Sequence, residues 1–386
     1  MRNRAIPYGR QNITQEDIDA VVSTLKSDFL TQGPKVEEFE TKFAQYIGSK
    51  YAVAVANGTA ALHLSALALG LEKGKKVITT PLTFVASANA VLYAGGEVDF
   101  CDIDSETLLL DIDLVREKLD SSPKGTYCGI IPVDFAGAPV QMDAFRALAD
   151  EYGLWLLEDS CHAPGGYFYD QSNEQQNCGN GNFANAAIFS FHPVKHIACG
   201  EGGMITTNDY SVYKKLLKLR THGITKNPDE LIENHGPWYY EMQSLGYNYR
   251  LDDISCSLGI SQLDRAKESL AKRRQIAKKY QDVLHGIQEL NFFNMDIEGH
   301  AYHLLVIETS KRRALYDHLR AHQIFAQVHY IPVHLQPYYQ SLGFKKGDFP
   351  KVEAHYEGCL SLPIFPSITE EELDYTINTI KNFFNV

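Results

Sequence analysis

The sequence predicts an α/β fold, with a mostly parallel sheet in a large domain and a smaller α+β domain at the C-terminal end. Between residues 51 and 208, short apolar runs alternate with longer segments of helical periodicity, which is typical of parallel strands joined by crossover helices. From residue 253 to about residue 284 the pattern changes to one helical stretch rich in Lys, Arg, Glu and Ala. Because 386 residues are enough for two domains, we expect a large domain over 1–252 and a small domain over 253–386 that begins with this long helix.

The apolar runs of the large domain are short and continuous, as in strands that are buried on both faces. Strands are predicted at 51–55, 77–80, 127–133, 154–158, 187–191 and 204–207, and helices at 59–69, 84–93 and 142–152. The last three strands are closely spaced, which leaves room for an antiparallel strand among them. In the C-terminal part we expect a strand at 304–307, a helix at 312–322, a strand at 325–330 and a closing helix. Thr369 and Glu372 have the spacing of a capping box at the start of that helix.

The composition is that of an ordinary globular protein, with 44% hydrophobic and 22% charged residues. A formal net charge of −12 opposes non-specific binding to nucleic acid. No stretch approaches the ~20 apolar residues that cross a bilayer, and no apolar segment follows the N-terminal arginines as in a secretory signal. The seven cysteines are scattered and include no C-x-x-C pair, which is typical of reduced thiols. These observations predict a cytoplasmic protein without nucleic-acid or membrane partners.

Three polar motifs follow predicted strands, where α/β sheets bind their ligands. The first, Asn57-Gly58-Thr59-Ala60, is a glycine turn that would aim backbone N–H groups at an anion. In the second, Glu158 and Asp159 end an apolar run, and in the third Lys195 lies in a short loop followed by glycines. Taken singly, the first two motifs are also common helix caps, and a lone lysine is usually a solvated surface residue.

Together, a phosphate cradle, a carboxylate and a lysine at neighbouring strand ends predict a site for pyridoxal phosphate. The lysine amine can condense with the cofactor aldehyde, and the carboxylate can keep the pyridine nitrogen protonated. The G-x-G-x-x-G and P-loop motifs of other phosphate-binding folds do not occur in the sequence. A metal site at His192, His196 and Cys199 is the weaker alternative, because no further ligand pair has the usual spacing. We therefore predict pyridoxal phosphate as the cofactor, and no metal.

Matching stretches over nearly the whole chain resemble the sugar aminotransferases of the DegT/DnrJ/EryC1 type, members of the aspartate-aminotransferase fold group (PLP fold type I). The stretches are FLTQGPKVEEFE, VANGTAALHL, PLTFVASANA, LEDSCHAPGG, SFHPVKHIACGEGGM, YNYRLDDISCSLGISQL and VHYIPVHLQPYY. The resemblance implies a transaminase that uses pyridoxal phosphate. It also implies a homodimer, because in this family an Asn of the neighbouring subunit reaches the cofactor phosphate. Asn248 matches that position.

The resemblance also implies roles for individual residues of the cofactor site. Lys195 would bind the cofactor aldehyde and carry the proton during transfer, and Asp159 would pair with the pyridine nitrogen. Phe84 would stack on the cofactor ring, and His162, where many relatives have Gln, would lie near the phenolic oxygen. The phosphate would be bound by Thr59, Ala60 and Ser190.

Finer features resemble the 4-aminotransferases of pseudaminic acid biosynthesis. RTHGITKN, GPWYYEMQSLGYNYRLDD and FAQVHYIPVHLQPYY carry this resemblance. It implies L-glutamate as amino donor and UDP-4-keto-6-deoxy-N-acetyl-β-L-altrosamine as acceptor. Histidine and tyrosine suit sugar binding, since each combines a polar atom with a flat apolar face, although buried tyrosines often bond to backbone instead. The candidate sugar contacts are Tyr8, His222, Tyr239, His329 and Tyr330.

Three alternatives remain at this point. A cofactor-dependent sugar dehydrase of the same family would have histidine in place of Lys195. A cofactor-free regulatory or scaffold protein on this fold would be favoured by loss of the lysine or the aspartate, and both are present. The acceptor could be another nucleotide-linked 3- or 4-keto-sugar, because a few hydroxyl contacts decide between such isomers.

Overall fold

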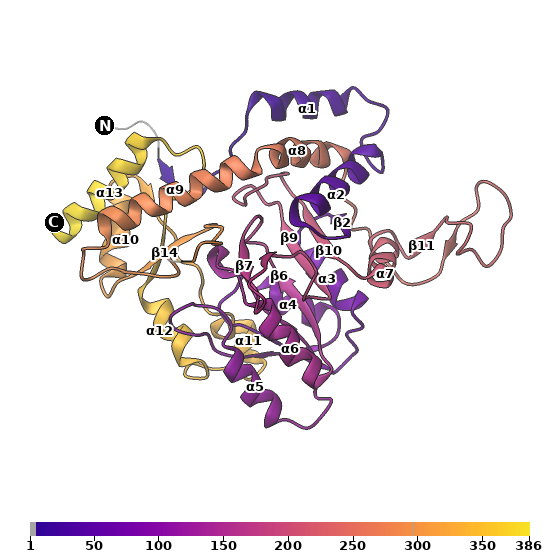
Figure 1. Ribbon diagram of the computed structural model, residues 1–386, viewed down its shortest axis with the longest axis horizontal. Coiled ribbons are helices and arrows are strands. Elements are labelled where there is room, and N and C mark those ends of the chain that lie inside the picture. The colour runs from indigo at the N-terminus through magenta and orange to yellow at the C-terminus, as the bar shows by residue number, and fades with distance from the viewer. Residues whose placement is uncertain (1–4, 296) are drawn as a thin grey trace.

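A seven-stranded sheet forms the centre of the molecule (Figure 1). The computed structural model describes residues 5–295 and 297–386. In spatial order the strands are β2 (Tyr51–Val55), β10 (Gly203–Thr207), β9 (Ala186–Ser190), β6 (Trp155–Asp159), β5 (Tyr127–Ile131), β3 (Lys76–Thr79) and β4 (Glu97–Phe100). β10 is antiparallel to both neighbours, and the other pairings are parallel. The predicted α/β class is confirmed, and β10 is the antiparallel strand for which the spacing left room.

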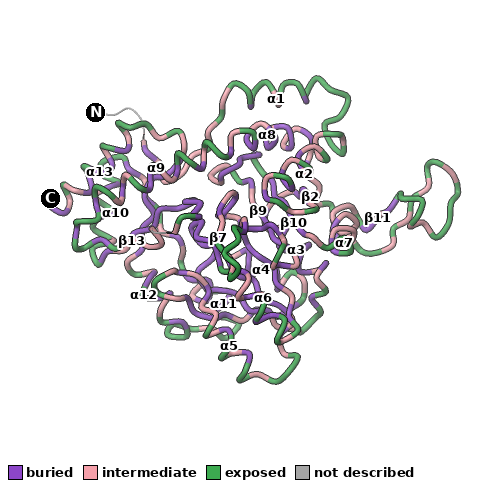
Figure 2. Tube along the Cα trace, in the orientation of Figure 1, coloured by how far each residue is buried: buried purple, intermediate pink, exposed green. Residues whose placement is uncertain are grey.

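The sheet is buried on both faces, as its continuous apolar strands predict (Figure 2). β2 shows this directly. Val53 and Val55 pack into one core with α3 (Gly58–Ala68), whereas Ala52 and Ala54 pack into another with α2 (Pro34–Ile47). The remaining helices of this part are α4 (Ala86–Tyr93), α5 (Ile112–Asp120), α6 (Met142–Tyr152) and α7 (Tyr210–Arg220). Strand β4, which the sequence analysis did not predict, forms one edge of the sheet.

The long helix predicted over residues 253–284 is interrupted, and in this respect the prediction was wrong. It consists of α8 (Asp253–Asp264) and α9 (Ala266–Leu284), and Arg265 between them leaves helical geometry with φ −116° and ψ 16°. The Arg265 guanidinium binds Asp17 of α1 (Gln15–Leu25) with an N–O distance of 2.6 Å. The residue at the break thus ties the helix pair to an N-terminal helix that packs on α8.

The C-terminal part combines a small antiparallel sheet with helices. Its elements are β13 (Asn291–Phe292), β14 (Leu305–Glu308), α10 (Arg312–Ala321), α11 (Pro337–Ser341), α12 (Pro350–Gly358), β16 (Cys359–Leu362) and α13 (Glu370–Phe384). The capping box of Thr369 and Glu372 at α13 is confirmed. The predicted strand at 325–330 was largely wrong. Only β15 (Ile324–Phe325) is a strand, and it pairs with β1 (Ile6–Pro7) near the other end of the chain. The division into two domains at residue 252 stays a prediction.

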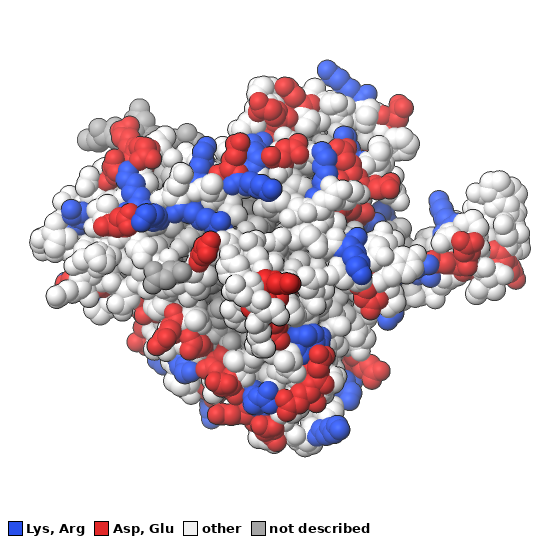
Figure 3. All heavy atoms as spheres, in the orientation of Figure 1, with Lys and Arg blue, Asp and Glu red and all other residues white. Residues whose placement is uncertain are grey.

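One hairpin leaves the body of the molecule, and we call residues 224–242 the arm (Figure 1). It starts with β11 (Ile224–Thr225) and returns through β12 (Glu241–Met242). Its base is closed by a bridge between Thr221 and Asn248. Most of the arm is exposed (Figure 2). On the face shown in Figure 3, acidic and basic side chains are interspersed over body and arm.

A few short elements complete the fold. They are β7 (Tyr167–Tyr169), β8 (Gln175–Asn177), η1 (Phe135–Gly137) and η2 (Val333–Leu335). All seven cysteines are free thiols, which confirms the prediction from their spacing. Within residues 5–295 and 297–386, no helix has the length and apolar character needed to cross a membrane.

Candidate active site

A cavity of about 450 Å³ lies where β6 and β9 end. Parallel strands present their carboxyl ends at one edge of the sheet, so the polar motifs that follow different strands meet there. Among the predicted site residues, the lining contains Tyr8, Thr59, Phe84, Asp159, His162, Ser190, Lys195, His329 and Tyr330. The structure therefore brings most of the predicted cofactor residues and three predicted sugar contacts into one cavity.

Four predicted site residues are placed elsewhere. The Ala60 N–H group donates to the Asn57 side chain at 2.8 Å, as in an ordinary helix cap. His222 and Asn248 lie at the base of the arm, and Tyr239 lies on the arm, where its hydroxyl bonds to Glu241 at 3.1 Å. In the described part of the chain, these four do not line the cavity of their own subunit.

Asp159 is held firmly at the end of β6, and its side chain is almost fully buried. One carboxylate oxygen accepts a bond from the Ser87 hydroxyl at 2.7 Å, and the other from the Cys161 N–H group at 3.2 Å. Ser87 is itself bonded to Thr83 at 2.8 Å. None of these donors is a cation, so a buried carboxylate faces the cavity with room for a positively charged partner. Ser87 was not among the residues predicted from the sequence, although Ser87 lies within the motif PLTFVASANA.

Lys195 reaches the cavity from the loop after β9, where its N–H group closes a turn onto the His192 carbonyl at 2.8 Å. Burial lowers the pKa of the Lys195 ammonium below its usual value, while the nearby Cys161 and Asp159 act in the opposite direction. A lowered pKa increases the fraction of free amine, which is the nucleophilic form. The site therefore favours condensation of Lys195 with an aldehyde.

The predicted phosphate cradle lies at the N-terminus of α3. Gly58 and Thr59, the first residues of this helix, line the cavity together with Ser190 at the end of β9. Gly203 of β10 permits the close packing behind this turn, because a Cβ atom there would lie 2.5 Å from the Asn57 carbonyl. A helix N-terminus with a neighbouring hydroxyl is well suited to a phosphate group.

His162 presents one defined nitrogen to the cavity. Its Nδ1 atom accepts a hydrogen bond from the Ala136 N–H group at 3.2 Å, so the proton of the neutral ring resides on Nε2. Nε2 lies 3.3 Å from the Tyr330 hydroxyl. Burial lowers the pKa of His162 well below its usual value, and the nearby Lys195 charge acts in the same direction. His162 is therefore a neutral N–H donor. His303, which the sequence analysis missed, packs against its ring at 4.3 Å between centroids.

The residues of this cavity fit pyridoxal phosphate. The cradle suits the phosphate, the unpaired charge of Asp159 suits a protonated pyridine nitrogen, and Lys195 suits the aldehyde. The comparison with known proteins agrees, because residues 11–381 match the DegT/DnrJ/EryC1/StrS aminotransferase family. The chain belongs to this family, and it is a pyridoxal-phosphate-dependent sugar aminotransferase.

Relatives match along nearly their full length. SpsC, a spore coat polysaccharide biosynthesis protein of Bacillus subtilis (strain 168), is 37% identical over 390 residues, covering 99% of this chain and 97% of its own. The structure of Helicobacter pylori PseC, an aminotransferase involved in the biosynthesis of pseudoaminic acid, superposes with a TM-score of 0.89 at 28% identity, covering 99% and 100%. The PLP-form of Spr1654 from Streptococcus pneumoniae superposes with a TM-score of 0.88 at 28% identity, covering 99% of each chain.

Proposed function

We propose that this enzyme transfers an amino group from L-glutamate to C4 of UDP-4-keto-6-deoxy-N-acetyl-β-L-altrosamine, a step of pseudaminic acid biosynthesis. The observation that carries this proposal is the full-length structural similarity to PseC. The motifs around His222, Tyr239 and His329 support it, because they resemble the 4-aminotransferases of that pathway. We place the reaction in the cytoplasm, in keeping with seven free cysteines.

In the proposed reaction, three side chains of the cavity have distinct chemical roles. Bound pyridoxal phosphate supplies an electron sink for the carbanion that forms next to the transferred nitrogen. Asp159, fixed by Ser87 and the Cys161 N–H group, holds the pyridine nitrogen in its charged form. Lys195, once released as a free amine, moves the proton that is taken from glutamate in one half-reaction and given to the sugar in the other. The neutral Nε2–H group of His162 would serve as a hydrogen-bond donor for the phenolic oxygen of the bound cofactor.

Tyr8, His329 and Tyr330 are the cavity residues that we assign to sugar binding. The Tyr8 ring packs against His329 at 4.9 Å between centroids, and Tyr330 lies 6.3 Å from the Phe84 ring. His329 bonds through Nδ1 to Ser361 at 2.9 Å, and burial lowers its pKa to about 3. It therefore contributes a neutral ring. Phe84 is 58% exposed in the single chain, which leaves its face free to stack on the cofactor.

We propose that the working enzyme is a homodimer with shared active sites. Asn248, His222 and Tyr239 lie outside the cavity of their own chain, as expected if they serve the partner's cavity. Two apolar surfaces support an interface. On α1, Ile18, Val22 and Leu25 share an outward face and are 38–53% exposed. On the arm, Ile232, Trp238 and Met242 are 61–85% exposed.

A different acceptor within the same chemistry is the second candidate. SpsC, at 37% identity, is named for spore coat polysaccharide biosynthesis, and that identity exceeds the 28% to PseC. This observation favours another nucleotide-linked 3- or 4-keto-sugar. The two candidates share the cofactor site and differ in the contacts of Tyr8, His329 and Tyr330 with the sugar hydroxyls.

An amino-transfer assay on the purified enzyme tests the proposal. It supplies glutamate with a panel of 3-keto and 4-keto UDP- and dTDP-sugars, alongside the Lys195→Ala variant and the matched surface control Lys73→Ala. Turnover of the L-altro UDP-4-keto-sugar that is lost only in Lys195→Ala would support the proposed function. Turnover of another keto-sugar alone would exclude our acceptor and retain the mechanism.

A further inference from the structure

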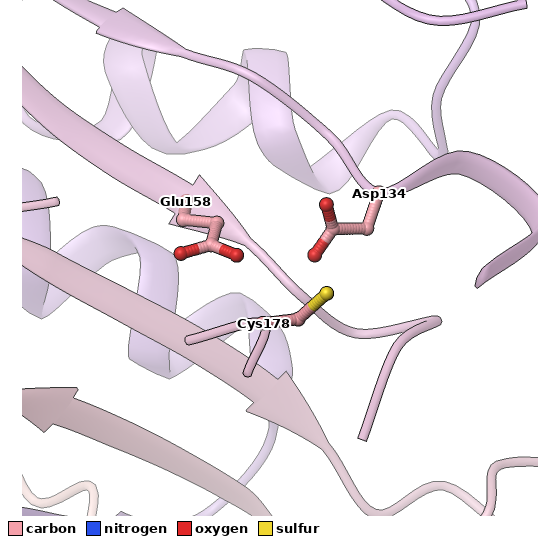
Figure 4. A group of neighbouring side chains, drawn as sticks. All are labelled: Asp134, Glu158 and Cys178. Carbon is pink, nitrogen blue, oxygen red and sulfur yellow. The ribbon is translucent and has the colours of Figure 1, made fainter. Parts of the chain in front are cut away.

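A pair of carboxyl groups lies directly behind the cofactor-binding carboxylate and has no part in the mechanism above. Asp134 follows β5, Glu158 belongs to β6, and both side chains are buried, with exposed fractions of 0% and 3%. The Cys178 thiol completes the cluster, and one ligand atom of each residue lies within 4.8 Å of the others (Figure 4). Side chains alternate along a strand, so Glu158 lies on the opposite face of β6 from Asp159, and Ser160, directly after the strand, bonds to Glu158 and Asp134.

The hydrogen bonds of this cluster require a proton on one carboxyl group. The Ser160 hydroxyl lies 2.7 Å from Asp134 Oδ2 and 2.9 Å from Glu158 Oε1, although it has one hydrogen to donate. Asp134 also accepts from the Val140 N–H group and Glu158 from the Gly179 N–H group, both at 2.9 Å. Two ionised carboxylates would leave one of these two short Ser160 contacts without a hydrogen, so one carboxyl group carries a proton and donates it.

The surroundings of the pair agree with one proton and one negative charge. In the described part of the chain, neither carboxyl group is in an ion pair with Lys, Arg or His. The titratable groups that face the pair are Asp159, Cys161 and Cys178, and none is a cation. Burial and mutual repulsion raise the pKa of Glu158 well above its usual value, and burial raises that of Asp134 to about 6. The two carboxyl groups therefore retain one proton between them, and Cys178 stays a neutral thiol because burial raises its pKa.

The pair is connected to Asp159 through the backbone on both sides. Glu158 and Ser160 are its neighbours in sequence, and the Asp134 N–H group donates to the Asp159 carbonyl at 3.1 Å. Asp159 in turn donates its N–H to the Pro132 carbonyl at 2.9 Å. The strand end that carries the cofactor carboxylate is thus fixed from behind. A second full negative charge at this place would also oppose the ionised form of Asp159.

We propose that Asp134 and Glu158 share one proton and, through Ser160, act as positioning residues that hold Asp159 in its place and in its charged form. This inference rests on the role proposed for Asp159. Glu158, the other acidic residue of the motif Glu158-Asp159-Ser160, has no part in the reaction itself and would act in this way.

The shared proton is tested by the pH dependence of unfolding in denaturant, with wild type, Glu158→Gln and the exposed control Glu174→Gln. Above the usual pKa of a glutamate, the unfolded chain has released this proton and the folded chain still holds it. As pH rises, this group therefore lowers the folding equilibrium constant of the wild type by about tenfold for each pH unit. The decrease ends once Glu158 ionises in the folded state too. Glu158→Gln should remove that contribution and Glu174→Gln should not. An unchanged slope in Glu158→Gln would overturn the proposal.

Positioning is tested on the holoenzyme by titrating the absorption of bound pyridoxal phosphate with pH and by measuring cofactor affinity. Ser160→Ala and Glu158→Leu should shift the titration and weaken cofactor binding several-fold, whereas Glu158→Gln, which retains a donor, should behave like the wild type. If Ser160→Ala and Glu158→Leu both match the wild type, the positioning role is wrong. Asp159→Asn is the reference variant. If it leaves the titration unchanged, the role proposed for Asp159 fails, and the pH slope still reports on the shared proton.

Discussion

The cavity and the arm differ in how completely one chain builds them. In the cavity, Asp159 has each carboxylate oxygen bonded and His162 has both ring nitrogens in contact with named partners. On the arm, Trp238 is 75% exposed and Ile232 is 85% exposed. A single chain therefore fixes the side chains of the cavity with hydrogen bonds of its own, whereas the arm leaves large apolar side chains exposed.

The largest expected effect follows from removing the cavity lysine. In Lys195→Ala the amine that binds the aldehyde and moves the proton is absent, so amino transfer should fall by about 10³-fold or more. Turnover with glutamate and the keto-sugar measures this, with Lys73→Ala as the exposed control. Activity that survives in Lys195→Ala would show that another group of the cavity carries the proton.

Asp159→Asn should lower amino transfer by at least about 10²-fold, because an amide cannot stabilise a protonated pyridine nitrogen. The amide keeps the shape of the carboxylate, so the unfolding midpoint should change little by comparison. Steady-state turnover and the absorption of the bound cofactor measure the two effects. Asp113→Asn at an exposed site is the control. Equal losses in stability and activity would point to a structural role instead.

The cavity was predictable because its key residues follow apolar strands within short motifs, so that the strand pattern alone brings Asp159 and Lys195 to one edge. Other features depend on contacts between distant parts of the chain. The break at Arg265 accompanies its bonds to Asp17, which is 248 residues away. Strand β4 was missed because Glu97–Phe100 is short and alternates with polar residues at a sheet edge. His303 was missed because no local pattern marks it.

The role of Asn248 was predicted only from the family resemblance, and its place in a shared site stays a prediction. A mixture of two inactive variants tests it. If Asn248 serves the partner's cavity, Lys195→Ala and Asn248→Ala refolded or exchanged together should form heterodimers with one intact site each. At equal mixing, activity should return to about a quarter of the wild-type value. No recovery, with heterodimers demonstrated by mass, would place Asn248 and Lys195 in the same site.

A buried histidine of the cavity should make the folded state sensitive to acid. Burial lowers the pKa of His329 to about 3. Below about pH 6.5 the unfolded chain binds a proton at residue 329 and the folded chain does not, so stability falls as pH falls, by about 1.4 kcal/mol per pH unit for this group. Between pH 6.5 and 5, His329→Gln should lower the slope of the unfolding free energy against pH by the contribution of one proton, about 1.4 kcal/mol per pH unit. A slope in His329→Gln equal to that of the wild type would contradict the burial argument.

The smallest effect on the folded chain is expected at the most exposed aromatic ring of the arm. Trp238→Ala removes a side chain that is 75% exposed, so the free energy of unfolding of the isolated chain should change by no more than about 0.5 kcal/mol. If the arm meets a second copy, the same change should weaken self-association by about tenfold or more, because buried tryptophans dominate interfaces. Sedimentation equilibrium measures the association, with the exposed Tyr210→Ala on α7 as control. If Trp238→Ala leaves self-association unchanged, the arm is not part of the interface. The apolar face of α1 would then be the remaining candidate.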